Sequence, residues 1–133
     1  MMNSSNHSIV LTRPDILLRL EGLFVLIASC AGYHVLYAGR WRLFAILFLL
    51  PDVAILAYLG SNKRLAAAAY NATHTYVFPI ILALTAWNMG LFVGGQIAVI
   101  WAAHIGFDRI LGYGLKFPKS FGFTHIQRCA APE

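Results

Sequence analysis

The sequence predicts an all-α, polytopic membrane protein, an antiparallel bundle of four transmembrane helices. The chain of 133 residues is 59% hydrophobic and only 11% charged, so it has too little polar surface to cover a soluble globule of this size. Four apolar segments each approach the roughly 20 residues with which a helix crosses about 30 Å of hydrocarbon. The apolar runs at residues 43–50 and 77–84 are nearly unbroken, whereas barrel strands alternate in polarity.

Each predicted element follows from local signals along the chain. The first span begins after Pro14, and Pro51 predicts a kink in the second. Residues 60–62 are turn formers, and a tight break around Trp87 separates the third span from the fourth. Glycines and Pro118 end the last helix, after which mixed aromatic and basic residues suit the headgroup region. The predicted segments are a polar tail at 1–15, spans at 16–37, 41–59, 65–86 and 88–111, and an interfacial tail at 112–133.

The basic residues predict the orientation of these spans. Eight of the ten Lys and Arg residues lie on the side that holds both termini and the second loop, and only Arg40 and Arg42 lie on the other side. We therefore expect a multi-pass protein of the bacterial inner membrane with cytoplasmic N- and C-termini. The net charge of +5 then reflects topology and attraction to anionic headgroups, so the expected partner is the lipid bilayer and not nucleic acid. Helices can pack closely at Gly90, Gly94 and Gly95, either within one chain or between two chains, so the sequence leaves both a monomer and a homo-oligomer open.

Polar residues inside the predicted spans mark the functional region. Counted from the cytoplasmic ends at about 1.5 Å per residue, they converge at one level, roughly 5–14 Å deep. These residues are Glu21, Asp52, Asn71, His74, His104 and Asp108. A buried acid costs about 2.5 to 3.5 kcal/mol even on lenient insertion scales, so these groups need protonation, a basic partner or a bound cation.

Two imidazoles beside three carboxylates form a mixed nitrogen and oxygen ligand set suited to zinc, iron or manganese. His104 and Asp108 are four residues apart, so they share one helix face as two ligands of one ion would. No haem is expected, because His34 lies at the wrong depth to pair with either imidazole. Two alternatives stay open: a hydrogen-bonded network that only joins helices, and a binding or transport protein for protons or cations.

Several motifs resemble known families. Residues 101–116, WAAHIGFDRILGYGLK, are the most distinctive. On this run and on four shorter motifs, the chain resembles a family of small bacterial four-helix membrane proteins of unknown function. The shorter motifs are Leu20-Glu21-Gly22, Pro51-Asp52, Tyr70-Asn71 with His74, and Thr124-His125. The resemblance covers about residues 17–125. It implies the fold and the location and carries no established activity.

The order of three motifs is also similar to that in small inner-membrane metal-dependent hydrolases that are regulated with the DNA-damage response. The motifs are Pro-Asp, then a histidine-bearing segment, and then His-x-x-x-Asp. That resemblance implies four metal ligands: Asp52, His74, His104 and Asp108. Val53 and Ala54 stand where those hydrolases carry a second acid.

These observations lead to a functional hypothesis. We expect a metal-dependent hydrolase that acts from the cytoplasmic leaflet on a lipid-borne or membrane-soluble phosphoester or amide. Glu21 would be the general base or acid. The remaining candidates would orient the ligands or contact the substrate: Tyr70, Asn71, Arg109, Lys116 and His125.

Overall fold

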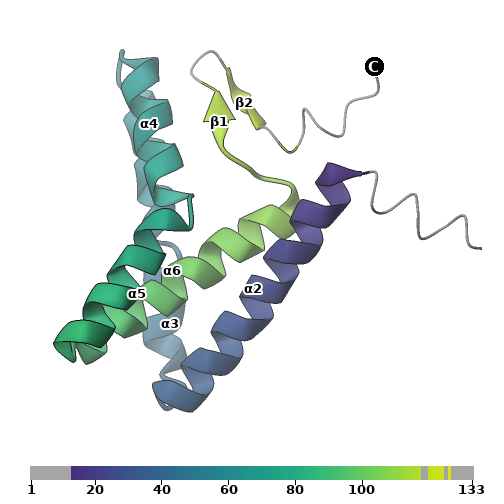
Figure 1. Ribbon diagram of the computed structural model, residues 1–133. Coiled ribbons are helices and arrows are strands. Elements are labelled where there is room, and N and C mark those ends of the chain that lie inside the picture. The colour runs from purple at the N-terminus through teal and green to yellow at the C-terminus, as the bar shows by residue number, and fades with distance from the viewer. Residues whose placement is uncertain (1–12, 118–119, 125, 127–133) are drawn as a thin grey trace, which may run out of the picture.

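The computed structural model describes residues 13–117, 120–124 and 126. In chain order the elements are α2 (Pro14–Leu36), α3 (Trp41–Phe48), the 3-10 helix η1 (Leu50–Leu59), α4 (Lys63–Thr73), α5 (Val77–Met89), α6 (Phe92–Leu111), β1 (Lys116–Phe117) and β2 (Ser120–Thr124). Figure 1 shows that the chain runs down in α2, up through α3 and η1, down through α4 and α5, and up again in α6. The up-and-down order agrees with the prediction, but two of the predicted helices are interrupted.

Helices α2 and α6 pack closely against each other. They approach at Gly22 and Gly106, where a Cβ atom built on Gly22 would lie 2.7 Å from the Gly106 carbonyl oxygen and 2.5 Å from Cβ of Arg109. Neither position has room for a side chain, so glycine permits the backbones to touch. This contact fixes the height of α6, which carries two of the predicted ligands.

The second predicted span, residues 41–59, is not one α-helix. Pro51 has no N–H, so it cannot donate to a carbonyl four residues back. The next donor, Asp52 N–H, bonds to the Leu49 carbonyl three residues back at 3.2 Å, and the chain continues as the 3-10 helix η1. The interruption therefore lies directly before Asp52.

The third predicted span, residues 65–86, is also divided. Helix α4 begins at Lys63 with Asn62 as its N-cap, whose side chain accepts from Leu65 N–H at 3.1 Å. It ends at Thr73 with His74 as its C-cap. Pro79 has no N–H to bond the carbonyl of Thr75, so a regular helix cannot run through this segment, and α5 starts afresh at Val77.

Glycines in the left-handed region end the last two helices. The break predicted around Trp87 lies instead at Gly90, which has φ 65° and is followed by a Leu91 N–H to Ala86 carbonyl bond of 2.8 Å. Gly112 ends α6 in the same way, with φ 88°. After it, β1 and β2 form a short antiparallel pair in which Lys116 is aligned with Thr124. The all-α prediction thus holds for the helical body and not for the tail.

The surface of the helical body is apolar. Phe24, Leu59 and Trp87 are each at least 80% exposed, whereas His74, His104 and Arg109 are buried. By length and composition α2 could cross a membrane, and α5 is apolar but shorter. Among the described residues α2 is the one helix that meets both criteria, so the four continuous spans of the prediction are not found as such.

Candidate metal centre

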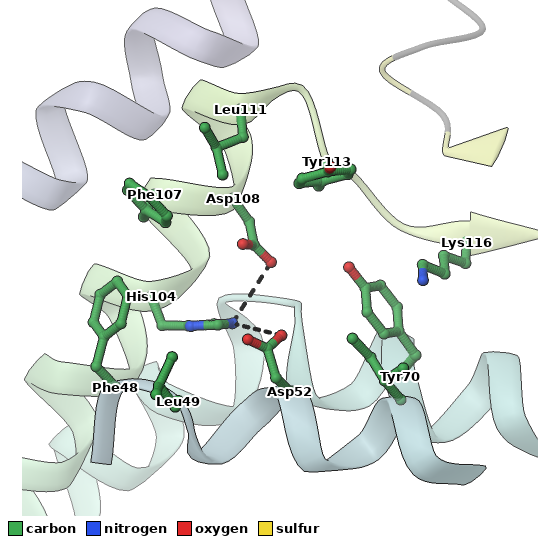
Figure 2. Close-up of a pocket in the computed structure, with 11 residues that line it drawn as sticks. Phe48, Leu49, Asp52, Tyr70, His104, Phe107, Asp108, Leu111, Tyr113 and Lys116 are labelled. Carbon is green, nitrogen blue, oxygen red and sulfur yellow. Dashed lines mark ion pairs between the residues drawn. The ribbon is translucent and has the colours of Figure 1, made fainter. Parts of the chain in front are cut away.

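The structure brings together all four residues that were predicted as ligands. Asp52 comes from η1, His74 from the end of α4, and His104 and Asp108 from α6. One ligand atom from each lies within 4.8 Å of all the others. The two histidines and Asp108 are buried, whereas the Asp52 side chain is 41% exposed. We call these four residues the His–Asp cluster; Figure 2 shows three of them, with both carboxylates turned towards His104.

Five of the six separations within the cluster match the edges of a tetrahedron. His74 Nε2 lies 3.4 Å from Asp52 Oδ1 and 3.3 Å from Asp108 Oδ2. His104 Nε2 lies 3.5 Å and 3.6 Å from the same two oxygens, and 3.3 Å from His74 Nε2. Ligand atoms placed roughly 2.0–2.2 Å from a tetrahedral zinc ion are about 3.3–3.6 Å apart. The five measured distances fall in that range.

The hydrogen bonds of His74 fix its tautomer. Its Nδ1 lies 2.9 Å from the Tyr70 carbonyl oxygen, which can only accept, so Nδ1 carries the hydrogen. Thr73 Oγ1 lies 2.8 Å from the same nitrogen. The lone pair of Nε2 then faces the cluster, as in metal-binding histidines whose other nitrogen donates to a carbonyl.

The cluster is a convergence of electron-pair donors. The His74 Nε2 lone pair, His104 Nε2 and two carboxylate oxygens converge on one centre. Two imidazole nitrogens 3.3 Å apart repel when both present lone pairs. A proton or a cation between them removes the repulsion, and the nitrogen and oxygen donor set suits zinc, iron or manganese.

Arg109 lies beside the cluster but faces the backbone. Its guanidinium donates to the carbonyl oxygen of His74 at 2.9 Å and to that of Tyr113 at 2.9 Å. The side chain is buried, so it is held within the protein. The structure therefore gives Arg109 contacts that differ from the predicted contact with an anionic headgroup.

Asn71 joins α4 to β1. Its amide donates to the Lys116 carbonyl at 3.0 Å, and its oxygen accepts from the Lys116 N–H at 2.7 Å. This reciprocal pair holds the Lys116 backbone in place. Asn71 was predicted to orient ligands or substrate, and in the structure it acts on the position of Lys116.

The Lys116 side chain lies over aromatic rings at the edge of the cluster. Its Nζ is 4.3 Å from the centroid of the Tyr70 ring and 5.4 Å from that of Tyr58. The other face of Tyr70 stacks on His74, with centroids 3.8 Å apart. Burial lowers the pKa of the Lys116 ammonium from its ordinary value, while the nearby carboxylates of Asp108 and Asp52 raise it.

A pocket of about 380 Å³ opens onto the cluster. Its lining combines three cluster residues with Lys116, two tyrosines and an apolar wall. The lining residues are Phe48, Leu49, Asp52, Ile55, Tyr70, His104, Phe107, Asp108, Leu111, Tyr113 and Lys116. A volume of this order is at the lower end for small-molecule sites, which run from about 300 to 1,000 Å³.

The predicted general base or acid is not brought to this pocket. Glu21 is exposed on α2 and does not line it. His125 lies outside the described residues. Sequence reasoning also missed Trp101, whose indole N–H donates to the Thr73 carbonyl at 2.6 Å, and Phe48, which packs edge-on against His104. The spacing of Trp101 one turn before His104 was the available signal.

Comparison with known proteins identifies the family. The chain belongs to the family described as Domain of unknown function (DUF4260), whose model matches residues 15–129. No curated protein and no solved structure gives a match. The match confirms the resemblance to an uncharacterised family, and it provides no support for the resemblance to metal-dependent hydrolases.

Proposed function

We propose that this member of the family is an integral membrane enzyme that binds a divalent metal ion and hydrolyses a membrane-borne phosphoester. The ion would be held by Asp52, His74, His104 and Asp108 at the cytoplasmic side. The observation that carries the proposal is the convergence of the four ligand atoms, all within 4.8 Å of one another, beside an open pocket.

The distribution of polar and apolar residues supports the membrane part. Large apolar side chains cover the outside of the helices, and four ionisable side chains at the cluster lie inside: His74, His104, Asp108 and Arg109. An exposed apolar surface of this extent marks contact with lipid or with a partner. The interruptions before Asp52 and after His74 fit the same picture, because irregular backbone at membrane depth is tolerated where it lines a cavity.

The exposure of one ligand, Asp52, supports the catalytic part. A divalent ion at this centre would act as a Lewis acid and make a bound water nucleophilic near neutral pH. Water would add to phosphorus, the phosphorus–oxygen bond to the alcohol would break, and the alcohol would leave with a proton. Asp52 is the ligand with the most exposed side chain, so its carboxylate is the group placed to take the proton from water.

Lys116 favours a phosphoester over an amide. Its ammonium lines the same pocket as Asp52 and His104, within reach of an anionic group placed beside the metal. An amide carries no charge that would use this cation. The substrate class is therefore the anionic one.

The first experiment is metal analysis of protein purified in a maltoside detergent without chelators. We expect close to one zinc, iron or manganese ion per chain, and its loss in His104→Ala. The matched control is His34→Ala, because His34 is exposed and stacks on Trp41, outside the His–Asp cluster. Cobalt reconstitution adds a geometric test, since tetrahedral cobalt absorbs strongly in the visible range.

Activity is tested on bis(p-nitrophenyl) phosphate with the same three proteins. Turnover in the wild type and in His34→Ala, and none in His104→Ala, supports the proposal. Stoichiometric metal without turnover, together with cation flux in vesicles that Asp52→Asn stops, would replace the hydrolase with a transporter. Absence of metal in the wild type refutes the metal centre itself.

A further inference from the structure

We infer that the pocket selects an amphiphile with a phosphate headgroup and a long apolar chain, and that it does so only when the metal ion is bound. The headgroup would lie between the His–Asp cluster and Lys116, and the chain would leave past Phe107 and Leu111. This inference rests on the proposed function and names its substrate class.

The pocket has a polar side and an apolar side. In Figure 2 the carboxylates of Asp52 and Asp108 lie in the middle, with Lys116, Tyr70 and Tyr113 to one side. The opposite side is formed by Phe48, Leu49, Phe107 and Leu111. A ligand that touches both sides needs a charged end and an apolar end.

The apolar side continues to the surface. Leu49, Phe107 and Leu111 are all exposed although they are large and apolar. Phe107 also packs against Phe48, with ring centroids 5.7 Å apart. A chain that leaves the pocket here would stay in contact with apolar side chains and then enter the surrounding lipid. The pocket itself, about 380 Å³, needs to hold only the headgroup and the first part of the chain.

The charges explain why the metal must bind first. Without it the carboxylates of Asp52 and Asp108 face the ammonium of Lys116 and, beside the cluster, the guanidinium of Arg109, so with neutral histidines the site has no net positive charge. A divalent cation makes the site positive. The loaded pocket then attracts an anion more strongly than the metal-free pocket does, which is a coupling of the two binding events.

The position of Lys116 is built into the fold. The reciprocal bonds from Asn71 fix its backbone, and the rings of Tyr70 and Tyr58 support its side chain. The Lys116 side chain thus lines the same pocket as Asp52, His104 and Asp108. Such preorganisation lowers the entropy cost of binding a headgroup.

The test is calorimetric binding of two phosphonates, which water cannot hydrolyse at their carbon–phosphorus bond. Dodecylphosphonate carries the chain, and methylphosphonate carries the headgroup alone. In a maltoside detergent, metal-loaded protein should bind dodecylphosphonate at least about tenfold more tightly than methylphosphonate, because several methylenes are buried. Metal-free protein should bind neither above the signal from detergent alone.

Variants separate the two ends of the ligand. Lys116→Gln should weaken both phosphonates about tenfold or more, with Arg42→Gln, an exposed cation on α3, as the matched control. Phe107→Ala should weaken only dodecylphosphonate, with Phe24→Ala, which is 80% exposed on α2 and outside the pocket, as its control.

The outcomes distinguish this inference from the proposed function. Equal affinity for the two phosphonates, or unchanged affinity in Lys116→Gln, overturns the inference while the metal centre stands. Binding of phosphonate to metal-free protein also overturns it. If the wild type binds no metal at all, the proposed function fails and the inference fails with it.

Discussion

Replacement of Gly22 by alanine tests the contact on which the position of α6 depends. A Cβ at this position would lie 2.5 Å from Cβ of Arg109 and 2.7 Å from the Gly106 carbonyl. Ordinary contacts start near 3.4 Å, so the helices must separate by about 0.7–0.9 Å or bend. Overpacking of this kind costs about 1–3 kcal/mol.

Gly32→Ala on the same helix is the matched control, because nothing lies within 4 Å of a Cβ built there. Both substitutions gain the same helix propensity, up to about 1 kcal/mol, which cancels in the comparison. We therefore expect Gly22→Ala to unfold at a Tm roughly 5 °C or more below that of Gly32→Ala, measured by circular dichroism in detergent. Equal Tm values for the two variants would refute the close α2–α6 contact.

Three further outcomes follow from the geometry of the site and the bundle. Zinc or manganese at 100 times its Kd should stabilise the wild type by about 2.7 kcal/mol in thermal unfolding, and should not stabilise His104→Ala; a stabilisation in both would place the ion elsewhere. Asn71→Ala should weaken phosphonate binding but keep the metal content, since it frees only the backbone of Lys116; metal loss would contradict that role. Tyr33→Phe should cost about 1 kcal/mol in unfolding and leave metal binding unchanged, because its hydroxyl accepts from Gln96 and donates to the Arg40 carbonyl, both outside the cluster.

Much of the site could be predicted from residue types and spacing. Asp52, His74, His104 and Asp108 were among the ionisable groups at one depth, and helical geometry placed His104 and Asp108 on one helix face. The prediction worked because an ionisable group inside an apolar segment is costly and needs partners. Glu21 met the same criterion by depth, yet it faces outward on α2. Depth along a helix is readable from the sequence, whereas the direction of a side chain around the helix depends on which neighbours pack against it.

The interruptions were harder to predict. Pro51 was recognised as a kink, but the 3-10 helix over Leu50–Leu59, which packs against α4, was not predicted. The division of the third span went unnoticed, although Pro79 blocks the helix there. Hydropathy alone treats residues 65–86 as continuous, because a single proline barely changes the mean hydropathy of an apolar run. The strand pair after α6 depends on Asn71, which is far away in sequence.

The same interruptions connect the stability of the fold to the geometry of the site. The end of α4 leaves backbone carbonyls without helical partners, and those of Thr73 and His74 are met by Trp101 and Arg109 from α6. Helix α6 therefore supplies two ligands and also the donors that hold a third ligand, His74, at the break. A shift of α6 along its axis would disturb His104, Asp108 and His74 together. This arrangement accounts for the need for glycine at Gly22 and Gly106, because the close α2 contact is what sets the height of α6.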